Sequence, residues 1–409
     1  MKTNSLLLVV APTALLWWGD GPFTAAFFFG TQHAAVDVHS KHVLFSTSNV
    51  MEAATKESII PTGADLDAYR VSYSTCTSEV SPTILSCPLP SDFPVGTFYR
   101  NGGCRFESDD GTRVMHPFDA DGMVCASTFD PDNQRILFRN KFVETEGYVQ
   151  DKATGTMTQR GIFGTMRSGG ILANIFRTNF KNVANTNVIH VGDKLYALWE
   201  GGKPYLLDPL TLKNVAGAGA AGETDLDGLL QDRTMSAHPR YDSVRDIWVT
   251  FGYNFDPQTT KTVVDLFELD NTKFRSTRTG RLRFVKDGPA LLHDFVITEN
   301  YMLFNLNKAT VSLEAGLKAI LGSGTFAEFI ELDEDATETQ LVLIPRSLFD
   351  DIDDGKSVEI DVLNDDRVKV VNTPFHANFH FSNGFEDENG QVIFDTVQTI
   401  QRDVSHNRR

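Results

Sequence analysis

The sequence is poor in the features that mark several common classes of protein. It has four cysteines and no CxxC pair, which argues against a disulfide scaffold and against a cysteine-based zinc site. It contains neither G-x-S-x-G nor H-E-x-x-H, the motifs of the commonest serine hydrolases and zinc proteases. Beyond the N-terminal region, no apolar run approaches the roughly 20 residues that a membrane-spanning helix needs.

Positive charge is also scarce. Lys and Arg total 37 against 54 Asp and Glu, giving a formal net charge of −17, and no basic run interrupts the body of the chain. Nucleic-acid binding depends on clustered positive charge, so we expect no nucleic-acid partner. With 41% hydrophobic and 22% charged residues, the composition is that of a chain able to fold around a core.

The N-terminal region reads as a targeting segment. Lys2 precedes an apolar run from Leu6 to Trp18, and a second apolar cluster covers residues 23–29. The first run is too short to span a bilayer but has the length of a signal-peptide core. We predict that residues 1–45 form a two-part plastid leader and that residues 46–409 form the folded domain. A plain secretory signal, or a stub that anchors the chain in a membrane, is the alternative.

Most of the chain reads as short strands joined by turns. Between Asn187 and Leu212, two glycine-containing turns separate three runs of β-branched and aromatic residues. Three strands in about 26 residues are typical of a propeller blade. Similar units recur at 246–270, 295–306 and 368–397. Helical periodicity is rare, with the best case at 313–321 after Ser312. The prediction is an all-β fold.

Two short motifs in the sequence do not predict a binding site. Residues 217–222 match G-x-G-x-x-G, but they follow a hairpin and precede an acidic segment, so we expect a small-residue loop and no nucleotide site. The run from Asp350 to Gly355 lacks the alternating acids of a calcium loop and predicts a solvated turn.

Three histidines form a more informative pattern. His238, His293 and His380 each flank a predicted strand, and they are separated by 55 and 87 residues. At about 50 residues per blade, these steps are roughly one and two blades, so the three imidazoles could converge on a propeller axis. Imidazole suits iron, copper, nickel and zinc alike, so spacing alone does not choose the metal. For any one strand histidine, a packing or surface role is the commoner alternative.

The same segments resemble a known family. The similarity starts at Leu89-Pro-Ser-Asp-Phe-Pro-Val-Gly-Thr-Phe-Tyr-Arg-Asn101 and continues through the segments 116–124, 139–148 and 185–187 and the three histidine segments. These motifs are similar to those of the carotenoid cleavage dioxygenases, the carotenoid oxygenase or retinal pigment epithelial membrane protein family, which also includes stilbene cleavers. Gly103 stands where the family usually has proline.

The resemblance implies a fold and a site. The fold is a seven-bladed β-propeller with a cap of loops and helices over an apolar tunnel and a central metal site. Four neutral histidines hold Fe(II) in the family, and by motif His238, His293 and His380 take three of those positions. Glu200 takes the place of a glutamate that accepts a hydrogen bond from a ligand imidazole. His116, His190 and His376 do not fall at ligand positions, so we interpret them as structural.

One departure from the family is large. The fourth family histidine lies well over a hundred residues beyond the third, but 29 residues follow His380 here. His406 does not sit in the expected setting, and two of the family's three glutamates are missing as well. We therefore expect a C-terminally truncated member whose last blades are missing. Two functions stay open: an iron-dependent dioxygenase that cleaves an alkene with O2, and a non-catalytic propeller that binds an apocarotenoid or a protein partner.

The expected substrate is a carotenoid or apocarotenoid. The chain has 30 phenylalanines, and aromatic walls suit a long polyene. A stilbenoid is the alternative, but stilbene-cleaving relatives are expected to carry lysine after a Thr-Glu pair, and Gly147 follows Thr145-Glu146 here. Residues 313–321 resemble the family's apolar patch, which predicts a peripheral contact with a membrane.

Overall fold

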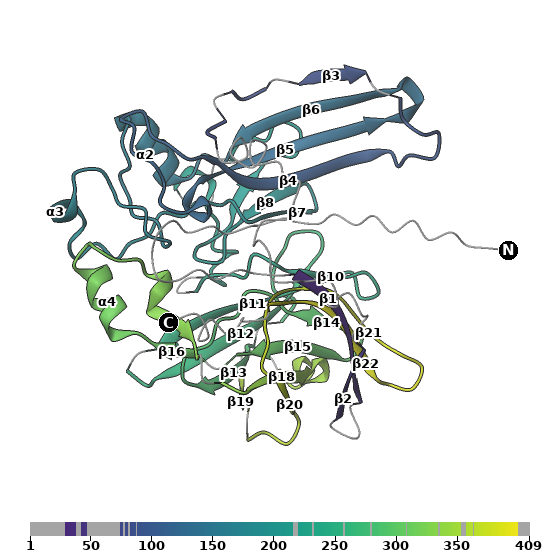
Figure 1. Ribbon diagram of the computed structural model, residues 1–409. Helices are drawn as coiled ribbons and strands as arrows, with labels where there is room; N and C mark the ends of the chain where they lie inside the picture. Colours follow the sequence, from purple (N-terminus) through teal and green to yellow (C-terminus); the bar gives the residue numbers. More distant parts are fainter. Residues whose placement is uncertain are drawn as a thin grey trace, which may run out of the picture.

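The computed structural model describes residues 29–37, 42–46 and 74–399, apart from 77, 81, 87, 216–219, 231–232, 257, 279, 308, 334–335, 353–356 and 363. Strands dominate the described residues, and they form five sheets of three or more strands and one two-stranded ribbon (Figure 1). We number these sheets 1 to 5 in chain order. Among the described residues, no helix is both long enough and apolar enough to span a bilayer.

Sheets 1 and 2 come from the first half of the described chain. Sheet 1 has the order β3-β6-β5-β4, with β3 at Thr83–Ser86, β4 at Gly96–Arg105, β5 at Asp121–Asp130 and β6 at Arg135–Phe142. Sheet 2 consists of β7 (Asn187–Val191), β8 (Lys194–Leu198) and β9 (Tyr205–Leu207). The three strands predicted between residues 187 and 212 are therefore present, joined by the predicted turns.

Sheets 3 and 4 form the centre of the described chain. Sheet 3 contains β10 (Arg240–Asp242), β11 (Ile247–Asp256), β12 (Lys261–Asp270), β13 (Leu282–Asp287) and β19 (Val358–Asp361), in that order. Sheet 4 has the order β14 (Val296–Ile297), β15 (Tyr301–Leu306), β18 (Glu338–Pro345) and β20 (Lys369–Pro374). Described strand pairs are antiparallel except β13 with β19. A separate ribbon pairs β16 (Ala309–Val311) with β17 (Ile330–Leu332).

Sheet 5 combines strands from the two ends of the described chain. It has the order β2-β1-β22-β21, with β1 at Phe29–Asp37, β2 at His42–Ser46, β21 at Ala377–Glu386 and β22 at Val392–Thr399. β1 pairs antiparallel with β22 from Phe29 to Val36. Both β1 and most of β2 fall within the predicted leader 1–45, whose other residues lie outside the described residues. The leader boundary stays a prediction, and a cleavage point before Phe29 would leave β1 in this sheet.

Apolar side chains on both faces of the strands join the sheets. In β15, Phe304 packs toward sheet 3 whereas its neighbour Leu303 packs toward sheet 5. In β8, Leu195 packs toward sheet 1 and Tyr196 toward sheet 3. Because successive side chains point to opposite faces of a strand, a central sheet covered on both sides needs a nearly continuous apolar run. Four such cores join sheets 1 to 5 in succession, and the predicted all-β propeller class is confirmed.

The α-helices of the described residues are short and lie on one side of the molecule (Figure 1): α2 (Glu146–Thr154), α3 (Ile171–Asn174) and α4 (Leu313–Ile320). Ser312 caps α4 by accepting a hydrogen bond from the Ala315 N–H, which confirms the predicted start of this helix. The buried Arg160 side chain donates to the carbonyl of Ala319 at the end of α4, and the Phe176 N–H donates to the carbonyl of Ile320. These bonds hold α4 beside α3.

The two doubtful motifs are only partly described. In the G-x-G-x-x-G match, residues 217–219 lie outside the described residues, and Ala220–Gly222 form a single 3-10 turn, η4. In the acidic run, residues 353–355 lie outside them.

Candidate metal centre

The three predicted ligand histidines lie together. The Nε2 atom of His293 is 2.9 Å from Nε2 of His238 and 3.1 Å from Nε2 of His380. Among the described residues, these three form the only group of three or more His, Cys, Asp or Glu side chains whose ligand atoms could hold one metal ion. The structure therefore brings the three imidazoles to a common point.

Their positions in the fold explain this convergence. His238 lies two residues before β10, His293 lies three residues before β14, and His380 lies within β21. β10, β14 and β21 are the edge strands of sheets 3, 4 and 5, and they lie side by side (Figure 1). Each histidine thus comes from the inner edge of a different sheet, as the blade-like spacing predicts.

Hydrogen bonds between side chains and backbone groups fix the segments that carry the histidines. The buried Ser236 hydroxyl accepts from the His238 N–H and donates to the His293 carbonyl. The Asn187 amide of β7 donates to the Ala237 carbonyl, and the Thr396 hydroxyl of β22 donates to the His380 carbonyl. The three ligand segments are therefore attached to sheets 2 to 5 and not only to their own strands.

Glu200 sets the orientation of one imidazole. It follows β8 and places its Oε2 2.6 Å from Nδ1 of His293. A carboxylate at this position accepts a hydrogen bond from the Nδ1–H group, so the proton stays on Nδ1 and the Nε2 lone pair faces His238 and His380. Burial alone would lower the pKa of His293, but the charge and hydrogen bond of Glu200 outweigh burial and raise that pKa.

The other two imidazoles are held neutral. Burial, together with the charges of His293, His380 and Arg240, lowers the pKa of His238 to about 2. Burial and the charges of His293 and Arg240 lower the pKa of His380 to about 4. A neutral imidazole with a free Nε2 lone pair is the form that binds a metal.

The donor set fits a divalent transition metal. The donor atoms are nitrogens of three imidazoles, whose ligand atoms all lie within 4.8 Å of one another. With metal–nitrogen distances of about 2.1 Å, ligands at right angles are about 3.0 Å apart and ligands at tetrahedral angles about 3.4 Å apart. The two separations from Nε2 of His293, 2.9 and 3.1 Å, are of the size expected for nitrogens that share one metal ion.

The histidines interpreted as structural lie elsewhere. The buried His116 accepts a hydrogen bond from the Phe118 N–H at the start of the 3-10 turn Pro117–Asp119 and stacks on Phe163. Burial lowers its pKa. His376 is buried against Thr373 and Pro374, and the exposed His190 stacks on Tyr99. None of the three joins the metal centre.

Sequence reasoning missed three residues that surround the centre. Arg240 and Asp294 form an ion pair of 2.6 Å behind the histidines. Burial raises the pKa of the Asp294 carboxyl, and the Arg240 charge opposes this shift. Phe379 is half exposed, and its ring centroid lies 4.4 Å from that of His293. Each lies within two residues of a ligand histidine in the sequence. This proximity is the one feature of the sequence that could have pointed to them.

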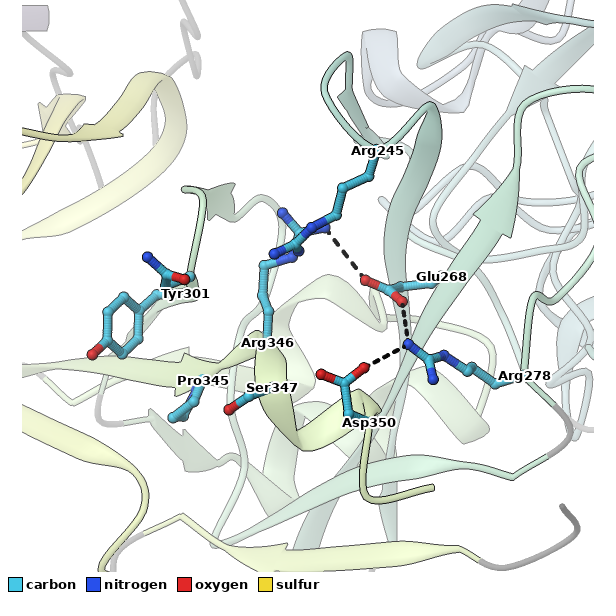
Figure 2. Close-up of a pocket in the computed structure, with 9 residues that line it drawn as sticks. Arg245, Glu268, Arg278, Tyr301, Pro345, Arg346, Ser347 and Asp350 are labelled. Atoms are coloured by element: carbon cyan, nitrogen blue, oxygen red, sulfur yellow. Dashed lines mark hydrogen bonds and ion pairs between the residues drawn. The ribbon is translucent and has the colours of Figure 1, made fainter. Parts of the chain in front are cut away.

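A cavity of about 460 Å³ lies apart from the histidines. It is formed where the turns after β10 and β14 meet the end of β18. His238 and His293 lie before the other ends of β10 and β14. Arg346, Glu268, Arg278 and Asp350 form a chain of ion pairs across it (Figure 2). The cavity is charged and is not the apolar tunnel that the resemblance implies. That tunnel stays a prediction.

Comparison with known proteins agrees with the fold. Residues 73–408 match the family model described as retinal pigment epithelial membrane protein. Apocarotenoid-15,15'-oxygenase of Synechocystis is 36% identical over 318 residues, which cover 76% of this chain and 57% of that protein. Carotenoid cleavage dioxygenase 7, chloroplastic, of Oryza sativa is 27% identical over 314 residues, covering 68% and 51%.

A solved structure is similar as well. The crystal structure of cobalt-substituted Synechocystis apocarotenoid oxygenase superimposes with a TM-score of 0.66 at 33% identity, covering 80% of this chain and 62% of that one. The chain thus spans between half and two thirds of the length of the relatives it matches.

Proposed function

Because this chain belongs to the retinal pigment epithelial membrane protein family, we propose that it is a non-haem Fe(II) dioxygenase acting on a carotenoid or apocarotenoid. The reaction inserts both atoms of O2 across one conjugated C=C bond and yields two carbonyl fragments, so atoms balance without a further reductant. The observation that carries the proposal is that Nε2 of His293 lies about 3 Å from Nε2 of both His238 and His380, and that the ligand atoms of these three histidines, from three sheets, all lie within 4.8 Å of one another.

In this proposal, His238, His293 and His380 hold the metal. When bound, Fe(II) supplies the one-electron redox chemistry that a reaction between O2 and an alkene requires. Glu200 keeps the Nδ1 proton of His293 in place, so that the imidazole stays a good ligand. The half-exposed Phe379 ring, beside His293, offers an apolar surface for a polyene next to the metal.

The structure around α2 favours a carotenoid over a stilbenoid. Gly147 lies in the first turn of α2, and a Cβ atom at this position would meet Cγ of Lys181 at 2.7 Å. Lys181 is itself held by ion pairs to Asp121 and Asp151. A lysine that could grip a phenol does not fit at residue 147 without displacing this buried network.

An apolar patch supports uptake of the substrate from a membrane. We define the patch as Ile171, Leu172, Phe176, Leu313, Leu317, Ile320 and Leu321, all of them at least about one third exposed. Leu172 is 86% exposed and Leu317 is 58% exposed. The bond from Phe176 to Ile320 makes the two halves continuous. Such a patch is the kind that inserts into one leaflet.

The N-terminal segment supports a plastid location, where carotenoids occur. Two of the similar plant proteins are named chloroplastic, which agrees with a plastid leader in residues 1–45. A secretory signal is the alternative. Fusing residues 1–45 to a fluorescent protein tests this location: plastid fluorescence supports it, and fluorescence confined to the secretory pathway contradicts it.

The direct test is incubation with apocarotenals of different length and β-carotene, with Fe(II) and ¹⁸O2, followed by mass spectrometry. The proposal predicts two carbonyl fragments from each cleaved polyene, both initially carrying the label. Tight binding of the polyene with no fragments would instead support the non-catalytic propeller. Cleavage of resveratrol but of no polyene would support the stilbenoid alternative.

A further inference from the structure

One ion pair ties together the backbones next to all three histidines. Nη2 of Arg240 lies 2.6 Å from Oδ2 of Asp294. The same Nη2 donates to the Phe381 carbonyl at 2.8 Å, and Nε donates to the Phe295 carbonyl at 2.8 Å. Asp294 also accepts from the Phe381 N–H at 2.9 Å and from the Phe295 N–H at 2.8 Å. The pair therefore binds sheets 3, 4 and 5 at once.

Its place in the sequence gives this pair its significance. Arg240 lies two residues after His238, Asp294 directly follows His293, and Phe381 directly follows His380. Separate strands lose their relative placement when the bonds between them are removed, and a metal site tolerates displacements of only a few tenths of an ångström. A group that fixes all three neighbours also fixes the separations between the Nε2 atoms.

We infer that Arg240 and Asp294 are a positioning pair that holds the three imidazoles close enough to share one metal ion. The inference rests on one part of the proposed function, namely that the three histidines bind a metal ion. Neither residue touches the metal, and both act through the backbones of the ligand segments.

A second ion pair, between Arg346 and Asp242, joins sheets 3 and 4 at the ends of β10 and β14 that lie away from the histidines, and it provides a matched control. Nη1 of Arg346 lies 2.7 Å from Oδ2 of Asp242 and donates to the Thr298 carbonyl. The Arg346 side chain is 1% exposed, against 26% for Arg240. Its loss should cost at least as much stability as the loss of Arg240, without changing the contacts of the histidines.

Electrostatics and positioning predict opposite results for Arg240. Its positive charge lies two residues from His238 in the sequence and contacts the Phe381 carbonyl next to His380, so it also repels a bound cation. If charge alone mattered, Arg240→Met would tighten metal binding. If the pair positions the ligands, the same variant loosens it despite removing the repulsion.

The test is a titration of the full chain with Co(II), followed by the visible absorption of the bound ion, alongside thermal unfolding. We expect Arg240→Met and Asp294→Asn to weaken Co(II) binding by about 10- to 100-fold, the range typical of partners behind metal ligands. We expect Arg346→Met to lower the melting temperature at least as much, with Co(II) affinity within about twofold of wild type. Arg240→Lys keeps the charge but cannot reach both carbonyls and the carboxylate, so it should weaken binding as well.

Unchanged or tighter Co(II) binding by Arg240→Met, or equal weakening by Arg346→Met, would overturn the inference. If Arg240→Met does not fold, Arg240→Lys decides by the same criteria. A wild-type chain that binds Co(II) but cleaves no polyene would refute the proposed activity and leave the positioning pair standing. A wild-type chain that binds no Co(II) would refute both.

Discussion

His293 makes more contacts at the centre than either of the other two histidines. Its Nε2 lies near both other Nε2 atoms, and its Nδ1 is held by Glu200. His238 and His380 each approach it from a neighbouring sheet. Removing His293 therefore takes away one ligand and the link to Glu200, and it leaves two nitrogens that face an empty space.

We expect His293→Ala to abolish iron retention and polyene cleavage. The physical reason is that the variant keeps two imidazole ligands and loses the one that Glu200 orients, so the metal is held less tightly. Iron content of the purified chain by mass spectrometry is the measurement. His376→Ala is the matched control, because His376 is equally a buried histidine near sheet 5 but contacts Thr373 and Pro374 instead of the centre. Full iron content in the His293 variant would rule out the assigned ligand set.

The residues of the site could be predicted to different degrees. His238, His293, His380 and Glu200 lie in long motifs, so their resemblance to a known family was sufficient to single them out. Arg240 and Asp294 could not be assigned roles, because spacing along the chain does not show that Asp294 reaches the N–H of Phe381, 87 residues away. Side-chain contacts between sheets require the three-dimensional structure.

Among the structural elements, the turn after β12 is held by one carboxylate. Asp270 accepts hydrogen bonds from the N–H groups of Thr272, Lys273 and Arg275. Although burial opposes the shift, a hydrogen bond from the Thr272 hydroxyl together with these backbone bonds lowers the pKa of Asp270 to about 2, from an ordinary value of 3.8. The charged form is therefore favoured in the folded chain.

We expect Asp270→Asn to destabilise the chain at neutral pH by about 1 kcal/mol, the usual contribution of such a capping carboxylate. Because the folded pKa is depressed, the contribution of Asp270 is present above about pH 4 and is lost as the pH falls toward 2. Urea unfolding of wild type and variant at pH 7, 5 and 3 measures the difference. A difference that stays constant or grows down to pH 3 would contradict this role.

The exposed leucines at the C-terminal end of α4 allow the proposed membrane contact to be tested. If the apolar patch enters a leaflet, Leu317→Asp with Leu321→Asp should remove most of the binding to liposomes, since a charged side chain cannot be buried there cheaply. Flotation of the chain with liposomes is the measurement. Leu210→Asp is the control, because Leu210 is 76% exposed in the turn after β9 and lies outside the patch. Equal loss in the control, or no loss in the double variant, would count against membrane contact.

The strands and α4 followed from the sequence because their signals are local. Residues 187–212 combine turn glycines with β-branched and aromatic runs, and Ser312 caps the amphipathic segment 313–321. Gly192 shows why the first turn needs glycine. It has φ +58°, and a Cβ there would lie 2.0 Å from the Thr272 carbonyl oxygen. The pairing of β1 with β22 was not predictable, because it joins residues separated by more than 350 positions.

For the whole molecule, the order of the sheets determines the site. Buried cores join sheets 1 to 5 face to face, so the inner edge strands of sheets 3, 4 and 5 are forced together. The repeat spacing predicted this arrangement, since residues at equivalent positions of successive blades meet near the axis. The count of seven blades refers to more than the five sheets described here and stays a prediction.

The central claim is that these three sheets hold one iron ion between them. Anomalous diffraction at the iron absorption edge, from crystals grown anaerobically with Fe(II), tests it most directly. The account predicts one strong peak within bonding distance of Nε2 of His238, His293 and His380. Absence of a peak there, or an iron ion bound elsewhere while these imidazoles contact only one another, would contradict it.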